Sequence, residues 1–174
     1  MDFEHVLVAG AGQMGAGIAQ VVAASGRRVS LYDAAPGATE HGLAAMRKSL
    51  EKLAAKGVPH DPDEVLARIQ AVGELVDADL LVEAVVEDAD VKRSIFRGAD
   101  VALGPDAVLA SNTSSIPIAS LAEATGRPER VIGMHFFNPV PVMALVEVVR
   151  APGTSDATVA EVVALAEELG KTLA

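Results

Sequence analysis

Apolar residues in this 174-residue chain gather in short runs that alternate with longer amphipathic stretches. The runs expected to form strands are 6–9, 29–32, 69–72, 80–86, 107–110, 131–134 and 142–149. The stretches expected to form helices are 18–24, 38–56, 63–68, 90–103, 118–124 and a last segment that begins at Thr154 or Ser155 and ends at 169–170. Near-continuous apolar strands that alternate with helices are typical of a parallel sheet covered on both faces. The pattern therefore predicts a doubly wound α/β fold.

The first apolar run leads into a glycine-rich turn, Gly-Ala-Gly-Gln-Met-Gly at positions 10–15, and then into a helix. A strand, the spacing Gly-x-Gly-x-x-Gly and a helix together open a dinucleotide-binding βαβ unit. Gly10 permits the tight turn, Gly12 lets a pyrophosphate approach the backbone, and Gly15 lets the helix pack closely on the strand. The N–H groups at the helix start then face the phosphates. We expect a Rossmann-type, mostly parallel sheet with helices on both faces; the alternative is a turn without a ligand.

An acidic residue strengthens this interpretation. Asp33 ends the second apolar run and lies 18 residues after Gly15. A carboxylate at this point accepts both ribose hydroxyls of the adenosine half of NAD and repels the extra phosphate of NADP. Arg27 and Arg28 lie at the opposite end of the strand, away from such a phosphate. The sequence predicts NAD as the cofactor, against the alternative that Asp33 only caps a loop.

Composition narrows the class of protein. With 51% hydrophobic and 22% charged residues, the chain is typical of a globular domain rather than a disordered one. No apolar run is long enough for a bilayer, and the first residues do not resemble a secretion signal. The absence of cysteine excludes disulfides, thiol catalysis and zinc–thiolate sites, and fits the cytoplasmic location that we expect. The net charge of −10 argues against nucleic-acid binding.

Polar residues follow several of the predicted strands. Because ligands bind at the carboxyl ends of strands in such sheets, residues 10–15, Asp33, Glu87 and residues 112–115 are expected on one edge of the sheet. His135 follows the next run and joins the same edge if its strand is parallel.

Glu147 interrupts the apolar run 144–149 and is expected to be at least partly buried. A buried carboxylate needs a hydrogen-bond donor or a cation, and His135 on an adjacent strand is a plausible partner. Glu147 would then fix the tautomer of His135 and stabilise its charged form, which makes the pair a general base for a hydroxyl proton beside a nicotinamide. The alternative is a core histidine bonded to a carbonyl and a glutamate on an edge strand. The other histidines have no ligand spacing, so we expect no metal site.

A basic stripe lies on the helix predicted over 38–56. Lys48, Lys52 and Lys56 are spaced by four and share one face. The stripe either meets the phosphates of a coenzyme or forms a solvated face that Glu51 partly balances.

Several segments resemble the 3-hydroxyacyl-CoA dehydrogenases, which include the 3-hydroxybutyryl-CoA dehydrogenases. They are Ser-Asn-Thr-Ser-Ser at 111–115, His-Phe-Phe-Asn-Pro-Val-Pro-Val-Met at 135–143 and Leu-Val-Glu-Val-Val at 145–149. The glycine turn and the Ala-Gly-Ile-Ala-Gln that follows it are also similar to that family. The resemblance covers essentially the whole chain, and the His-Phe-Phe-Asn-Pro block is its most specific part.

The resemblance implies a role for each matching residue. It implies that His135 is the catalytic base, that Glu147 is its partner, and that Ser114 hydrogen-bonds the substrate oxygen and the nicotinamide region. It also implies coenzyme A contacts at Ser49 and Lys56. With the glycine motif, the expected cofactor-binding residues are Gly10, Ala11, Gly12, Gln13, Met14, Gly15, Asp33, Glu87, Lys92, Asn112, Ser114 and Asn138.

The implied reaction is the NAD-dependent oxidation of a (3S)-hydroxyacyl-CoA to the 3-oxoacyl-CoA, or its reverse, in fatty acid metabolism. The family continues into an all-helical domain that closes the substrate cleft and forms the dimer, so residues 1–174 correspond to the NAD-binding domain alone. We expect a homo-oligomer for the full-length form and partial or no turnover without that domain. The alternatives are a non-catalytic NAD(H)-binding module, or a dehydrogenase of a free 3-hydroxy acid or of a carrier-bound acyl group.

Overall fold

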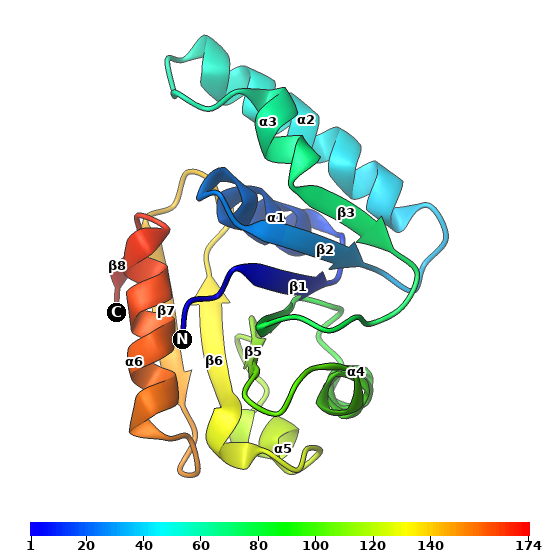
Figure 1. The fold of residues 1–174 in the computed structure, drawn as a ribbon, viewed down its shortest axis with the longest axis vertical. Helices are drawn as coiled ribbons and strands as arrows, with labels where there is room; N and C mark the ends of the chain where they lie inside the picture. Colours follow the sequence, from blue (N-terminus) through cyan, green and yellow to red (C-terminus); the bar gives the residue numbers. More distant parts are fainter.

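Eight strands form one sheet in a computed structural model that describes residues 1–174 (Figure 1). They are β1 (His5–Ala9), β2 (Arg28–Tyr32), β3 (Ile69–Val72), β4 (Leu80–Glu83), β5 (Val108–Ser111), β6 (Val131–Phe136), β7 (Leu145–Arg150) and β8 (Thr172–Leu173). Their order across the sheet is β3-β2-β1-β4-β5-β6-β7-β8. All neighbours are parallel except β6 and β7, which are antiparallel.

Helices cover both faces of this sheet (Figure 1). They are α1 (Gln13–Ala24), α2 (Ala38–Ala55), α3 (Pro62–Ala67), α4 (Ala89–Ala102), α5 (Ile118–Ala122), α6 (Asp156–Glu168) and a 3-10 helix, η1 (Pro128–Arg130). Alternate residues of β1 divide the core: Val6 and Val8 pack with α1, α2 and α6, whereas Leu7 and Ala9 pack with α4 and α5. The alternation follows from the two-residue period of a strand. The predicted Rossmann-type, doubly wound fold is confirmed.

Two predicted strands are too long, and both errors fall at the edge where polar residues gather. The strand predicted over 80–86 ends at Glu83, because the Glu83 carboxylate accepts the N–H of Val85 and turns the chain away. The strand predicted over 142–149 begins only at Leu145, because residues 139–143 form a turn in which the N–H of Met143 bonds the carbonyl of Pro139. In both places apolar residues lie in exposed loops: Val86 is 69% and Val142 is 68% exposed.

Close backbone contacts hold α1 and α2 against the turn that follows β1. A Cβ at Gly15 would lie 1.8 Å from the carbonyl oxygen of Gly10, and one at Gly42 would lie 2.8 Å from that of Ala11. Gly10 itself has φ +108°, a conformation that other residues rarely adopt. Glycine at these places lets the helix starts converge on the turn.

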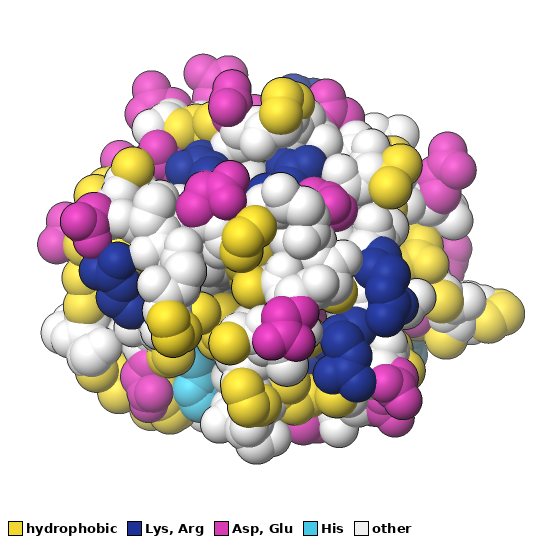
Figure 2. All heavy atoms as spheres, turned by 90° about the horizontal axis from the view of Figure 1, so that it is seen from below, with side chains coloured by type: hydrophobic (Ala, Val, Ile, Leu, Met, Phe, Trp, Pro, Cys, Tyr) yellow, Lys and Arg dark blue, Asp and Glu magenta, His cyan; other side chains and the backbone are white.

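None of the helices combines the length and the apolar character that a membrane crossing needs. On the face drawn in Figure 2, acidic and basic side chains are interspersed with apolar ones. That face carries no continuous basic surface of the kind that attracts nucleic acid.

Candidate active site

The glycine turn leaves an open approach to the start of α1. A Cβ at Gly12 would meet nothing within 4 Å, and no side chain caps the helix at this residue. Asp33, just after β2, accepts the N–H of Ala11 at 2.9 Å and the N–H of Ala35 at 2.9 Å. The uncapped N–H groups and the free space at Gly12 fit a pyrophosphate, and the carboxylate beside them fits a ribose. The residues present therefore suit the dinucleotide that the sequence predicts.

Replacing Gly12 or Gly15 with alanine distinguishes an effect on NADH binding from an effect on stability. We expect Gly12→Ala to change the free energy of unfolding by less than about 0.5 kcal/mol but to weaken NADH binding, because its Cβ points into the open approach. Gly15→Ala should cost about 1–3 kcal/mol of stability, because its Cβ meets the Gly10 carbonyl. Urea unfolding and NADH fluorescence titration measure the two effects; unchanged NADH affinity in Gly12→Ala would contradict the assignment.

A cavity of about 320 Å³ lies at the carboxyl ends of the strands, beside the start of α1. It brings together seven of the predicted site residues, namely Met14, Glu87, Lys92, Asn112, Ser114, His135 and Asn138. Ala84, Val85, Phe136 and Phe137 complete its wall. The side-chain oxygen of Asn112 accepts the N–H of Phe136 at 2.7 Å, which ties the end of β6 to the loop after β5.

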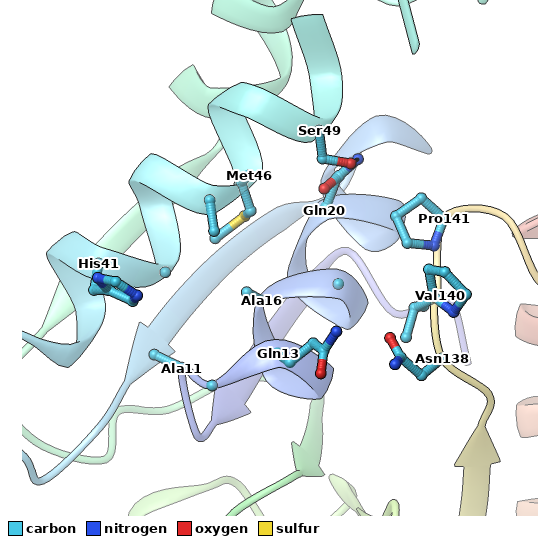
Figure 3. Close-up of a pocket in the computed structure, with 15 residues that line it drawn as sticks. Ala11, Gln13, Ala16, Gln20, His41, Met46, Ser49, Asn138, Val140 and Pro141 are labelled. Atoms are coloured by element: carbon cyan, nitrogen blue, oxygen red, sulfur yellow. Dashed lines mark hydrogen bonds between the residues drawn. The ribbon is translucent and has the colours of Figure 1, made fainter. Parts of the chain in front are cut away.

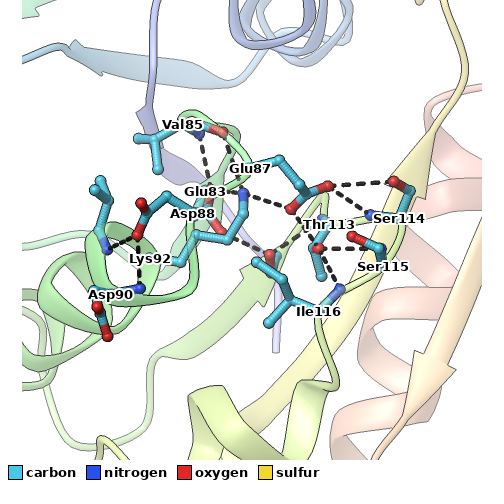
Figure 4. A network of polar contacts seen from close by, with 12 residues as sticks. Glu83, Val85, Glu87, Asp88, Asp90, Lys92, Thr113, Ser114, Ser115 and Ile116 are labelled. Atoms are coloured by element: carbon cyan, nitrogen blue, oxygen red, sulfur yellow. Dashed lines mark hydrogen bonds and ion pairs between the residues drawn. The ribbon is translucent and has the colours of Figure 1, made fainter.

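A buried ion pair between Glu83 and Lys92 lies under this cavity. The sequence predicted Lys92 as a site residue but did not predict Glu83. Glu83, at the end of β4, is fully buried, and its Oε2 lies 2.6 Å from Nζ of Lys92 (Figure 4). Its Oε1 accepts the hydroxyl of Ser111 at 2.6 Å. Lys92 is 2% exposed, and its ammonium donates to Glu83 and to the carbonyl of Val85. The sequence feature that could have indicated Glu83 is that it is an acidic residue inside the apolar run 80–86.

The same network reaches the serine loop through Glu87 (Figure 4). Glu87 accepts the hydroxyls of Thr113 at 2.7 Å and Ser114 at 3.2 Å, and it lies 3.6 Å from Nζ of Lys92. Desolvation of Glu87 raises the pKa of its carboxyl, but the hydrogen bonds from Thr113 and Ser114 and the charge of Lys92 outweigh it, so the net pKa is lowered. Glu87 is therefore a carboxylate at neutral pH and holds the loop that carries Ser114.

His135 and Glu147 face each other across the antiparallel pair β6–β7, where they are register partners. Nδ1 of His135 lies 4.0 Å from Oε1 of Glu147, so the two approach without a close hydrogen bond. Their side chains are 21% and 44% exposed, so Glu147 is partly buried as expected. The Phe137 ring packs against the imidazole in a tilted arrangement, with a centroid distance of 4.6 Å and an interplanar angle of 51°. The predicted adjacency is confirmed, and His135 and Phe137 both line the cavity.

A second cavity, of about 480 Å³, lies between α1, α2 and residues 138–141 (Figure 3). On its α2 side, Ser49 accepts a hydrogen bond from the amide of Gln20 on α1 at 3.0 Å. Asn138 lines both cavities, so the two meet at that residue. Lys56, the C-cap of α2, lines neither cavity, and its expected contact with coenzyme A stays a prediction.

Comparison with known proteins agrees with this arrangement. The family model described as 3-hydroxyacyl-CoA dehydrogenase, NAD binding domain, matches residues 5–173. The probable 3-hydroxybutyryl-CoA dehydrogenase of Bacillus subtilis is 48% identical over 177 residues, 99% of this chain and 62% of the relative. The mitochondrial hydroxyacyl-coenzyme A dehydrogenase of Sus scrofa is 42% identical over 179 residues, 97% of this chain and 57% of the relative.

A solved structure gives the same result. The crystal structure of (S)-3-hydroxybutyryl-CoA dehydrogenase from Ralstonia eutropha matches with a TM-score of 0.93 at 42% identity, over 99% of this chain and 62% of that one. The chain thus spans about three fifths of the length of these relatives. The resemblance found in the sequence is confirmed: the chain belongs to the 3-hydroxyacyl-CoA dehydrogenase family and corresponds to its NAD-binding domain.

Proposed function

We propose that this domain serves the NAD-dependent interconversion of (3S)-hydroxyacyl-CoA and 3-oxoacyl-CoA, with His135 as the general acid/base. The observation that carries the proposal is the meeting of His135, Ser114 and Asn138 in one cavity beside the glycine turn. The names of the relatives support the same reaction class.

The glycine turn, Asp33 and the polar residues of the first cavity would hold the dinucleotide. Asp33 is placed for the adenosine ribose and the start of α1 for the pyrophosphate. When bound, NAD⁺ supplies the hydride acceptor for the oxidation. Met14 and Asn112 line the cavity into which the nicotinamide end would extend.

Side chains of this domain transfer the hydroxyl proton of the substrate. One ring nitrogen of His135 takes the hydroxyl proton of the substrate, and Nδ1 lies on the side of Glu147. The nearby carboxylate stabilises the imidazolium that forms and favours one tautomer of the neutral ring. The hydroxyl of Ser114 would hold the substrate oxygen, in a position set by Glu87. In the reverse direction His135 returns the same proton to the carbonyl oxygen.

The second cavity supplies a path for a long thioester substrate. It joins the first cavity at Asn138 and runs along Ser49 and Gln20. We propose that the pantetheine arm lies there, with Ser49 among its contacts and Lys56 near the more distant phosphates of coenzyme A. A free 3-hydroxy acid would leave this cavity unused, and a carrier-bound acyl group would use only the part that pantetheine fills.

The test is the oxidation of NADH by acetoacetyl-CoA, with the chain alone and with the C-terminal part of the Bacillus subtilis relative fused after residue 174. We expect NADH binding in both proteins and rapid turnover in the fusion. NADH binding without turnover in either would favour a non-catalytic NAD(H)-binding module. Turnover of free acetoacetate as fast as of its coenzyme A ester would favour a free 3-hydroxy acid as substrate.

Three further expectations stay predictions. They are a second, all-helical domain that closes the cleft, a homo-oligomer of the complete protein, and a cytoplasmic location. Size-exclusion chromatography with light scattering on the chain and on the fusion tests the second: the fusion should be oligomeric.

A further inference from the structure

A buried lysine with no acidic partner lies between α6 and β8. Lys171 is 9% exposed, and its Nζ donates to the carbonyls of Val140 at 2.6 Å and Met143 at 2.7 Å. No carboxylate lies within 4.0 Å of it. Burial lowers the pKa of the ammonium, because removing a charge from water is costly. A methionine would fill the same space without the cost of the charge, but it would leave the two carbonyls without these donors.

The two carbonyls belong to one helical turn. The N–H groups of Val142 and Met143 both bond the carbonyl of Pro139. A single turn leaves its last carbonyls without backbone partners. Lys171 satisfies two of the carbonyls of the segment 139–143 from a position at least 28 residues further along the chain. The turn therefore has local backbone bonds to Pro139 and a tertiary donor, Lys171, for two of its other carbonyls.

This turn connects the parts of the candidate site. It joins β6, which carries His135, to β7, which carries Glu147. Val140 is 2% exposed and packs against α1. A Cβ added at Gly17 of α1 would lie 2.9 Å from the Cβ of Val140. Asn138 directly precedes the turn and lines both cavities; Figure 3 shows it at the second of them, near Val140 and Pro141. Lys171 therefore hydrogen-bonds the turn, and α1 packs against it at Val140.

We propose that Lys171 is a positioning residue for nucleotide binding: it holds the turn 139–143 so that Asn138, which lines both cavities, stays in place beside the glycine turn. Its two hydrogen bonds fix the turn at the cost of a buried charge. The proposal depends on NAD binding by this domain and not on the turnover proposed above.

Lys171→Met tests this role in the 174-residue chain. We expect the dissociation constant for NADH to rise about tenfold, equivalent to about 1.4 kcal/mol. The melting temperature should change little, because the lost hydrogen bonds are offset by the removed desolvation cost. Hydrogen exchange at the amides of Val142 and Met143 should accelerate about tenfold. Lys171→Arg, which keeps the charge and the donors, should restore part of the affinity.

Arg97→Met is the control, since it removes an exposed cation that lines neither cavity and should leave NADH affinity unchanged. Unchanged NADH affinity in Lys171→Met would overturn the proposal. So would a large drop in melting temperature with no loss of affinity, or a variant that does not fold, because either result assigns Lys171 a purely structural role. Failure of the dehydrogenase reaction would appear separately, as NADH binding without turnover in the fusion.

Discussion

Replacing Glu83 with glutamine is expected to lower the free energy of unfolding by about 3–5 kcal/mol, because it leaves the ammonium of Lys92 buried without its main partner. Glu83 is fully buried, Lys92 is 2% exposed, and 2.6 Å separates their charged atoms. For a domain of this size the loss corresponds to a melting temperature lower by about 6–20 °C. Urea unfolding and differential scanning calorimetry measure both values.

Two further variants isolate the cause. Glu87→Gln removes a carboxylate that is 42% exposed and 3.6 Å from Lys92, so it should cost less than about 1 kcal/mol. The double variant Glu83→Gln/Lys92→Met removes both buried charges and should recover most of the lost stability. If Glu83→Gln unfolds at the same urea concentration as the unchanged chain, then the carbonyl of Val85 and Glu87 are sufficient partners for Lys92.

Local spacing accounts for the parts of the site that could be predicted. The glycine turn and Asp33 are set by residues close in sequence, and the topology of a doubly wound sheet then places them at one edge. The pairing of His135 with Glu147 could also be predicted from the sequence, because two strands joined by a short connection are usually neighbours in the sheet. The antiparallel register that puts the two residues directly opposite each other came only from the structure.

Contacts between distant segments account for what could not be predicted. An acid in an apolar run predicts a strand residue, and nothing in the run indicates that Lys92 and Ser111 contact Glu83. No local pattern around Lys171 indicates that its amine bonds the carbonyls of Val140 and Met143. Lys56 lies outside the lining of both cavities, so its contact with coenzyme A stays a prediction.

The residues around the site form two groups, one that we expect to affect stability and one that we expect to affect the reaction. Glu83, Lys92 and Ser111 tie β4, α4 and β5 together below the cavity. Glu87 and Thr113 then fix the loop that presents Ser114. His135 and Glu147 are more exposed, and the structure does not need their charges for its core. Substitutions in the first group should therefore act on stability, and substitutions in the last pair on reaction rate.

His135→Ala is expected to reduce kcat of the fusion protein by about 10²–10⁴-fold, the usual contribution of a positioned general acid or base. NADH affinity and melting temperature should stay close to those of the unchanged protein, because the imidazole makes no close hydrogen bond and contacts only Glu147 at 4.0 Å and the Phe137 ring. Steady-state oxidation of NADH by acetoacetyl-CoA gives the rate, and fluorescence titration gives the affinity.

Companion variants separate the base from its surroundings. Glu147→Gln keeps the size of the side chain but removes the charge 4.0 Å from Nδ1, so kcat should fall about tenfold, which is less than for His135→Ala. His60→Ala removes an exposed histidine outside both cavities and should leave kcat unchanged. A His135→Ala protein that retains more than about a tenth of the original kcat would show that another group, or solvent, moves the proton.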